Sequence, residues 1–398
     1  MTSAPTTPAL LGVSPRGRYE HVDALRALAV MLVVVAHAGL GHMVPGGSGV
    51  TIFFAISGFI ITHILLIERE RTGGFRLSDF YLRRLLKLSP PFVLLVAAPT
   101  VAWAALGHHV DGGAFAAQVF FAFNWVYMHG LPDVLPGSAV VWSLAIEEQF
   151  YIAFALFWLG AVLLRRRLAV LTALALTTVV GSLVVRIVLV ASAGAEEAHR
   201  RIYYGTDTRA DGIAFGILAA VVFAHARHGT LTDRWRRAVS SSWAPALALA
   251  LYLASLLVRD PWFRETLRYS LQALAAATVI VYGLERQDGA LRAALGRVAG
   301  LRIVQTIGLA SYSIYLAHLS VALLLAETLS TLPMPASFAL AVIAGTGLGT
   351  AVWWWVERPV EAYKVRLMRA RAATHARAGA PEPAPVAPAP STTSGGTR

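Results

Sequence analysis

Long apolar runs separated by short polar segments dominate this chain. Runs of about 17 to 25 apolar residues have the length that a helix needs to cross a hydrocarbon core. They predict an all-α polytopic membrane protein with about ten transmembrane helices. The predicted spans lie near residues 22–41, 49–67, 88–106, 142–164, 168–190, 210–226, 244–258, 267–284, 303–326 and 337–357.

The run at residues 115–131 is an exception, because it is short and Asn124 interrupts it. Basic residues crowd segment 68–87 and three consecutive arginines occupy 165–167, and loops with this bias normally face the cytoplasm. Only an even number of crossings can separate two cytoplasmic loops, and the spans at 88–106 and 142–164 supply two. We therefore expect one re-entrant or interfacial helix at 115–131, with both termini cytoplasmic.

Composition supports a membrane protein and excludes several other classes. Hydrophobic residues make up 57% of the chain and charged residues 14%. The formal net charge is +12, but the basic residues lie in short loops between apolar runs, so no nucleic-acid partner is expected. The chain has no cysteine, which excludes disulfides, thiolate metal sites and a cysteine nucleophile. We expect no metal and no permanently bound cofactor.

The composition also divides the chain into three parts. Residues 1–20 lack a signal-peptide core and predict a cytoplasmic N-terminal segment. Residues 21–365 contain all the predicted spans and form an integral membrane domain. Residues 366–398 become rich in alanine and proline without apolar periodicity, which predicts a disordered cytoplasmic tail.

The first predicted span carries a cation near its start and a titratable base near its end. Arg26 and His37 are eleven positions apart, which places them on one stripe of a helix. Ionisable groups inside a membrane are costly and normally face a bundle interior or a water-filled cavity. The alternative is that Arg26 extends to the interface and His37 is a hydrogen-bonded core residue.

Small residues occupy the middle of the second predicted span. Ser57 and Gly58 lie there without the G-x-S-x-G pattern of a nucleophile elbow. We therefore expect them to allow close approach of a neighbouring helix.

A cationic face precedes the third predicted span. Arg84 and Lys87 are three residues apart and therefore neighbours on one face of an amphipathic helix, which we expect to end at Pro90, where the next span opens. Such a face suits lipid headgroups, and it equally suits the phosphates of a nucleotide-bearing donor such as coenzyme A.

Two adjacent carboxylates head the fourth predicted span, in the sequence WSLAIEEQFY that begins at Trp142. Adjacent helical residues point about 100° apart, so at most one of Glu147 and Glu148 should face the same cavity as His37. The alternative is that both carboxylates lie at the membrane interface, where acidic side chains stabilise the start of a helix.

Two further polar stretches border later spans. Arg209 and Asp211 lie close together, as an ion pair at a helix mouth or as a polar rim for a hydroxylated acceptor. Tyr312 and Tyr315 share a helix face by their spacing, as do Tyr315 and His318. We take Trp142, Arg209, Asp211, Tyr312 and His318 as acceptor-binding or structural polar residues.

Taken together, these stretches resemble the acyltransferase 3 family, the membrane O-acyltransferases that modify bacterial surface glycans and some antibiotics. The resemblance covers about residues 20–365 and depends on several motifs in the family's order. They are Arg26 and His37 as R-x10-H, GVTIFFAISGFIIT, RRLLKLSP, WSLAIEEQFY, TDTRADGIAFG, ASYSIYLAH and the final ERP. This sequence departs from the family's pattern in two places. Thr51 stands where the family commonly has an Asp, and Lys87 stands where an Arg is usual.

The resemblance implies acyl transfer in the bacterial cytoplasmic membrane, from cytoplasmic acyl-CoA, with acetyl-CoA as the expected co-substrate, to a hydroxyl of a sugar, cell-envelope glycan or glycosylated metabolite. His37 is the expected base or transient acyl carrier, with Glu147 or Glu148 orienting its ring. Arg26, Arg84 and Lys87 are the expected donor-binding residues. The rival function is a proton-coupled transporter or flippase, which also needs intramembrane ionisable groups.

Overall fold

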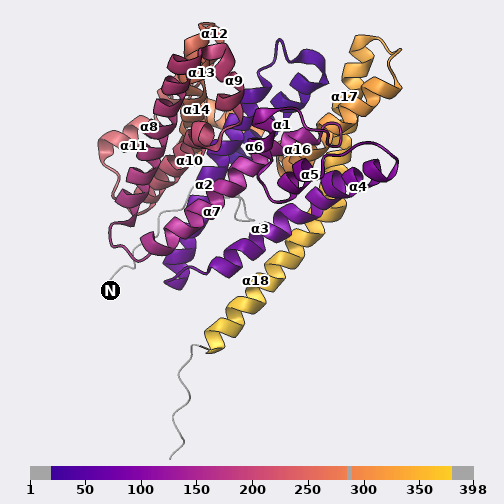
Figure 1. Cartoon of the computed structure of the whole chain (residues 1–398). Helices are drawn as coiled ribbons and strands as arrows, with labels where there is room; N and C mark the ends of the chain where they lie inside the picture. Colours follow the sequence, from indigo (N-terminus) through magenta and orange to yellow (C-terminus); the bar gives the residue numbers. More distant parts are fainter. Residues whose placement is uncertain (1–18, 285–288, 379–398) are drawn as a thin grey trace, which may run out of the picture.

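The computed structural model describes residues 19–284 and 289–378 of the chain. Every regular element within these ranges is a helix, which confirms the predicted all-α fold class. Figure 1 shows one bundle of helices, from which α18 (Arg358–Ala378) extends at the end where α2 finishes and α3 begins. We call this the α18 end of the bundle.

Eight of the described helices are long and apolar enough to cross a bilayer, and the bent pair α11 (Asp233–Ser240) and α12 (Trp243–Leu257) makes nine if it is one span. This number of crossings identifies a multi-pass membrane protein. The eight are Glu20–Leu40 (α1 and η1), Gly46–Thr72 (α2), Leu77–Ala105 (α3, η2 and α4), Ser138–Ala161 (η3 and α7), Arg167–Ala193 (α8), Thr206–Arg227 (α10), Arg302–Thr328 (α16) and Met334–Thr374 (α17, η4 and most of α18).

The remaining predicted span, 267–284, corresponds to α14 (Arg268–Leu284). This helix has 17 described residues and packs against α2, α10 and α12. All ten predicted segments are thus helical, but eight or nine qualify as crossings by length and composition. The count of ten stays a prediction.

The segment predicted to be re-entrant or interfacial does not cross the bundle. It forms two short helices instead of one, α5 (Gly112–Val119) and α6 (Phe123–His129), and neither is long enough to span a bilayer. The backbone N–H of Asp111 donates to the carbonyl of Asp133 at 2.7 Å, so the segment returns to the side from which it starts.

A cysteine-labelling experiment tests this return directly, because the chain has no cysteine of its own. Single cysteines at His109 and Asp133, which are both exposed, should react with a membrane-impermeant maleimide from the same side. A cysteine at Arg166, predicted to lie on the other side, is the control. Labelling of positions 109 and 133 from opposite sides would make this segment a crossing.

Pro90 and Pro91 lie inside a continuous helix, so the expectation that a new helix opens at Pro90 is wrong. Helix α3 (Leu77–Phe92) continues without interruption into the π-turn η2 (Val93–Ala97) and α4 (Ala98–Ala105). A proline lacks its N–H and its ring clashes with the preceding turn. The wider turn that follows absorbs the change in hydrogen-bond register.

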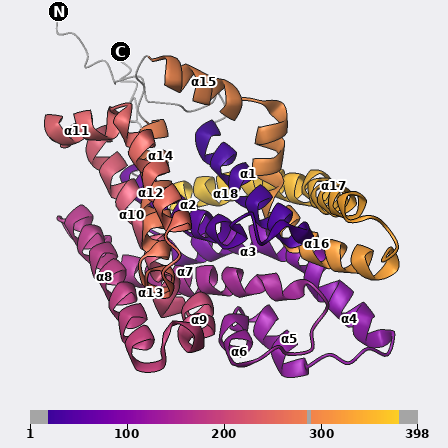
Figure 2. The ribbon, with the colours of Figure 1, turned by 90° about the horizontal axis from the view of Figure 1, so that it is seen from above.

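Glycines set the closest helix crossings. A Cβ atom at Gly58 of α2 would collide with the backbone of Ile213 in α10, and one at Gly308 of α16 with the backbone of Asp23 in α1. The predicted packing role is therefore confirmed for Gly58, while the neighbouring Ser57 donates a hydrogen bond to Glu147. Figure 2 shows α1, α2 and α16 among the inner helices, with α8 and α17 toward the periphery.

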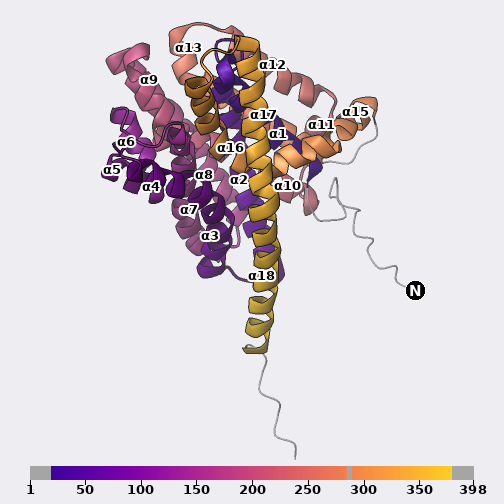
Figure 3. The same cartoon turned by 90° about the vertical axis from the view of Figure 1, so that its right-hand side faces the viewer.

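Helix α18 continues from α17 (Met334–Val352) through the π-turn η4 (Trp353–Glu357) and extends beyond the other helices (Figure 3). Arg371 Nε donates to Asp79 Oδ1 of α3 at 2.7 Å, which holds α18 beside α3. The expected disordered tail from residue 366 is therefore helical up to residue 378, since its first part packs on α3. Residues 379–398 of that predicted tail, and residues 1–18 of the predicted N-terminal segment, lie outside the described residues.

Candidate functional site

Arg26 and His37 face the same neighbouring helix, α16, as their shared stripe predicts. Arg26 Nε donates to Ser311 Oγ at 3.2 Å, and His37 Nδ1 lies 2.9 Å from His318 Nε2. Ser311 and His318 are two turns apart on α16. The shared stripe is thus confirmed, although the π-turn η1 (Ala36–Leu40) widens the helix around His37.

Hydrogen bonding determines which nitrogens of the histidine pair carry protons. His318 Nδ1 lies 2.7 Å from the carbonyl oxygen of Tyr315, which can only accept, so this nitrogen must donate. Neutral His318 then offers a lone pair at Nε2, and His37 Nδ1 must donate to it. A neutral His37 therefore keeps an unprotonated Nε2. Since His318 is 1% exposed and His37 is exposed, the available lone pair belongs to the accessible ring.

A central cavity of about 2020 Å³ enters the bundle from the α18 end. It is larger than the usual range of small-molecule sites, about 300–1,000 Å³, so it has room for a bulky ligand. Polar groups on its wall include Arg26, Ser57, Glu147 and Ser311. The lining residues farthest from the α18 end are Val50, Phe53, Ser143 and Tyr315.

An aromatic layer closes the inner end of the central cavity. The Tyr315 hydroxyl donates to the Val140 carbonyl at 3.0 Å and lies 2.8 Å from Ser143 Oγ, which fixes its ring. Its ring centroid is 6.1 Å from that of Phe53 and 5.6 Å from that of His318. His37 is absent from the described residues that line the cavity, so this layer stands between the cavity and the histidine pair.

The predicted cationic face of α3 lines the central cavity, but both cations are paired. Arg84 forms an ion pair with Glu148 of α7 (Trp142–Ala161), and its guanidinium lies 3.9 Å from the Tyr151 ring centroid. Lys87 forms an ion pair with Glu357, whose other oxygen accepts from Ser313. These cations therefore hold α3 against α7 and η4.

The expectation that Glu147 or Glu148 orients the His37 ring is wrong. Glu147 accepts from Ser57 Oγ at 2.6 Å and from the Tyr151 hydroxyl at 3.2 Å, while Glu148 pairs with Arg84. His318, on a different helix, takes the orienting position. As expected, the two adjacent carboxylates point to different partners because their directions on α7 differ by about 100°.

Arg209 and Asp211 are both 1% exposed and do not pair with each other, contrary to the expected ion pair. Asp211 accepts from Arg186 at 2.8 Å and from Ser270 at 2.6 Å. Arg209 donates to Thr51 at 2.9 Å, and the Tyr269 ring centroid lies 4.1 Å from its guanidinium. Both side chains are buried and link neighbouring helices, so they do not form an exposed rim.

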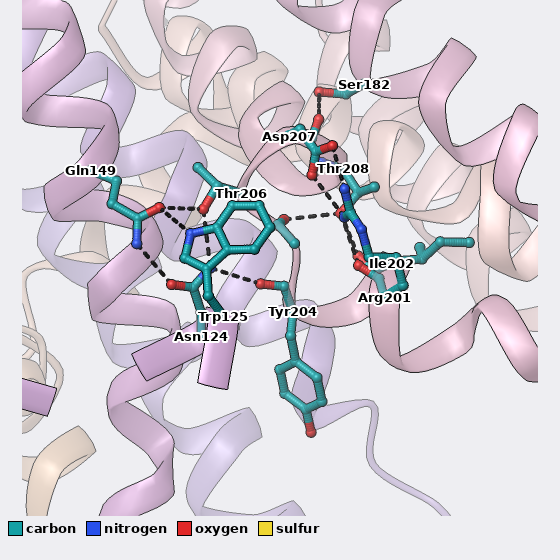
Figure 4. Close-up of polar contacts among 11 residues, drawn as sticks. Asn124, Trp125, Gln149, Ser182, Arg201, Ile202, Tyr204, Thr206, Asp207 and Thr208 are labelled. Atoms are coloured by element: carbon teal, nitrogen blue, oxygen red, sulfur yellow. Dashed lines mark hydrogen bonds and ion pairs between the residues drawn. The ribbon is translucent and has the colours of Figure 1, made fainter. Parts of the chain in front are cut away.

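A polar junction joins α6, α7 and α10 next to the loop that follows α9 (Ala195–Tyr204). Gln149 accepts from Trp125 and Thr206 and donates to Asn124 (Figure 4). Asn124, the residue that interrupts the predicted re-entrant segment, donates in turn to the Tyr204 carbonyl at 3.0 Å. The polar side chain of Asn124 thus attaches α6 to the bundle.

Trp142 and Tyr312 are the remaining two of the predicted acceptor-binding or structural polar residues. The Trp142 ring centroid lies 5.1 Å from that of Tyr203 and 4.9 Å from that of Tyr204, and Trp142 is 6% exposed. Tyr312 lines the central cavity and donates its hydroxyl to the Leu88 carbonyl at 3.1 Å.

Sequence reasoning missed several partners that complete the site. Ser57, Ser311, Ser313 and Glu357 all hydrogen-bond to a predicted residue or to its partner. Glu357 carries a signal in the sequence, because a carboxylate beside an apolar run is costly unless it is paired. The serines carry no such signal, since serine is common at helix contacts.

Comparison with known proteins gives a family match over most of the chain. A model described as an acyltransferase domain matches residues 19–358. A peptidoglycan O-acetyltransferase of Listeria monocytogenes, OatA, is 30% identical over 316 residues, which are 75% of this chain and 48% of that protein. A Bacillus subtilis protein, YrhL, whose name gives peptidoglycan O-acetyltransferase as a provisional assignment, is 28% identical over 371 residues, 89% of this chain and 56% of that protein.

The chain therefore spans about half the length of these curated relatives. No solved structure gives a significant match.

Proposed function

The chain belongs to the acyltransferase family that the matching domain model describes, and from this premise we propose that it transfers an acetyl group from acetyl-CoA to a hydroxyl group of a cell-wall glycan. Two of its relatives are named for O-acetylation of peptidoglycan. The central cavity supports a bulky donor, and its mouth at the α18 end is the expected cytoplasmic side.

The observation that carries this proposal is the free Nε2 of His37. The chain of hydrogen bonds from His37 through His318 to the Tyr315 carbonyl holds the His37 ring and keeps its outer nitrogen unprotonated. Histidine is a suitable base for an alcohol, because the proton-free imidazole nitrogen can take up the hydroxyl proton as the oxygen attacks.

The proposed reaction is a direct transfer. As the acceptor oxygen attacks the thioester carbon, its proton moves to His37 Nε2 and the C–S bond breaks after the new C–O bond has formed. The leaving thiolate then receives the proton from His37, which restores the neutral ring. Arg26, which lines the cavity beside Ser311, offers positive charge for the developing oxyanion.

The two substrates approach from opposite sides in this proposal. The thioester enters through the central cavity as far as the layer of Phe53 and Tyr315, and the glycan hydroxyl reaches His37 from the other side of that layer. Movement of one ring would bring the reacting atoms together.

The proposal is tested with purified protein, ¹⁴C-acetyl-CoA and muropeptides released from unacetylated peptidoglycan. We expect label in an alkali-labile ester on the sugar, identified by mass spectrometry. Heat-unfolded protein is the control for non-enzymatic transfer. Absence of labelled sugar, with protein that remains folded, would contradict the proposed donor or acceptor.

His318 should act as a positioning residue. The variant His318→Phe removes the acceptor for His37 Nδ1–H, so we expect kcat to fall about 10-fold or more with little change in KM for acetyl-CoA. His318→Gln, whose amide can accept from His37 and donate to the Tyr315 carbonyl, should recover part of kcat. Equal losses in both variants, together with lower melting temperatures, would indicate a role in packing alone.

A further inference from the structure

Three arginines at the rim of the central cavity have neither a charged nor an aromatic partner among the described residues. Arg71 lies in the last turn of α2, Arg76 precedes α3 and Arg302 starts α16. All three are exposed and line the cavity. The part of the chain that the structure describes holds no ion-pair or side-chain hydrogen-bond partner for them. We call them the rim arginines.

The other arginines and lysines of the cavity wall have partners, which are carboxylates except at Arg358, whose guanidinium lies 4.4 Å from the Trp354 ring centroid. Arg83 forms an ion pair with Glu68 at 2.6 Å, and Lys364 pairs with Glu361 at 2.5 Å. Arg84 and Lys87 pair with carboxylates deeper in the cavity. Apart from Arg358, the rim arginines therefore carry the positive charge that no carboxylate compensates, and such charge at a cavity mouth attracts anions and concentrates them there.

We propose, on the basis of the donor proposed above, that the rim arginines bind the phosphate groups of a nucleotide-bearing thioester. Arginine suits phosphate because its planar fork can donate two parallel hydrogen bonds. This assigns phosphate recognition to Arg71, Arg76 and Arg302, and leaves Arg84 and Lys87 with the carboxylates that they hold in the structure.

The depth of the cavity agrees with this assignment. Along α16, the distance from Arg302 to Tyr315 is about 20 Å at 1.5 Å per residue. The pantetheine arm between the phosphates and the sulfur has the backbone length of about four extended residues, or about 15 Å. Phosphates at the rim would therefore bring the thioester beside Ser311 and Tyr312, next to Arg26, which donates to Ser311.

Binding measurements with a graded set of ligands test the proposal without an acceptor. The triple variant Arg71→Gln/Arg76→Gln/Arg302→Gln and wild type are titrated by calorimetry with coenzyme A, 3′-dephospho-coenzyme A and pantetheine, in neutral phosphatidylcholine nanodiscs. The matched control is Arg165→Gln/Arg166→Gln/Arg167→Gln, which loses the same charge at residues that do not line the cavity.

We expect the rim variant to bind coenzyme A at least 10-fold more weakly than wild type, dephospho-coenzyme A with a smaller loss, and pantetheine within about twofold of wild type. The control should bind all three ligands as wild type does. An unchanged affinity of the rim variant for coenzyme A would overturn the proposal.

Three other outcomes would also overturn it, and they are distinguishable. If the rim variant keeps its affinity for coenzyme A but loses a stabilisation by phosphatidylglycerol that wild type shows, the arginines bind lipid headgroups. If wild type binds no coenzyme A but transfers acetyl groups from acetyl-pantetheine, the donor is not a nucleotide and the proposed donor fails together with the rim site. Weaker binding of coenzyme A to the Arg84→Gln/Lys87→Gln variant than to the rim variant would return phosphate recognition to α3.

Discussion

Replacement of His37 by glutamine should leave a folded protein whose kcat for acetyl transfer is lowered about 100-fold or more. Glutamine keeps hydrogen-bonding capacity and approximate size but cannot take up a proton near neutral pH. Its side chain can still donate to His318 Nε2, so the contact with α16 is retained. The measurement is donor-dependent acetylation of muropeptides by wild type and variant at equal folded concentration.

The matched control for this variant is His42→Gln. His42 lies in the turn just after η1, is exposed, and makes no side-chain contact that the structure describes. It should keep wild-type turnover. Wild-type turnover in His37→Gln would remove His37 from the mechanism and leave the histidine pair as a structural contact.

The same variant separates a base from a transient acetyl carrier. A carrier would form an acetyl-imidazole at Nε2 with release of the thiol, and the acceptor oxygen would then take the acetyl group from nitrogen. Wild type mixed with acetyl-CoA in the absence of acceptor would then gain an acetyl group on His37, detectable by mass spectrometry after rapid quenching. Direct transfer predicts no such adduct.

Local periodicity predicted those parts of the site that depend on a single helix. The stripe of Arg26 and His37 and the shared face of Arg84 and Lys87 follow from 3.6 residues per turn, and the structure confirms both. Loop charge correctly predicted that residues 115–131 do not cross, because the positive-inside bias acts on each loop separately.

Pairing between helices could not be predicted in this way. The sequence favoured neither Glu147 nor Glu148 as the partner of His37. In the structure Glu147 accepts from Ser57 and Glu148 pairs with Arg84. The ring of His37 is oriented by His318 instead. Asp211 pairs with Arg186, a residue that appears in sequence only as one basic position in an apolar span. Such pairings depend on which helices are adjacent and at what height, and one sequence carries no information on either.

The pair of Lys87 and Glu357 should be the most sensitive of the ion pairs to loss of one member. The Glu357 side chain is 2% exposed and that of Lys87 is 31% exposed. Breaking a buried pair typically costs about 3–5 kcal/mol, because it leaves an uncompensated charge. Since Lys87 retains some access to the water of the cavity, we expect Glu357→Gln to lower the free energy of unfolding by about 2 kcal/mol, which is below the range for a fully buried pair.

Two further variants show whether this cost comes from the stranded charge. Lys87→Met/Glu357→Gln removes both charges and should recover most of the stability, because a buried pair replaced by neutral groups of similar volume is often as stable as the original. Glu361→Gln in α18, four residues after Glu357, removes a carboxylate that is 50% exposed from its pair with Lys364, and should cost less than about 1 kcal/mol. The measurement is thermal unfolding in one detergent for all variants. A double variant no more stable than Glu357→Gln would mean that Glu357 stabilises the fold through Ser313 rather than through Lys87.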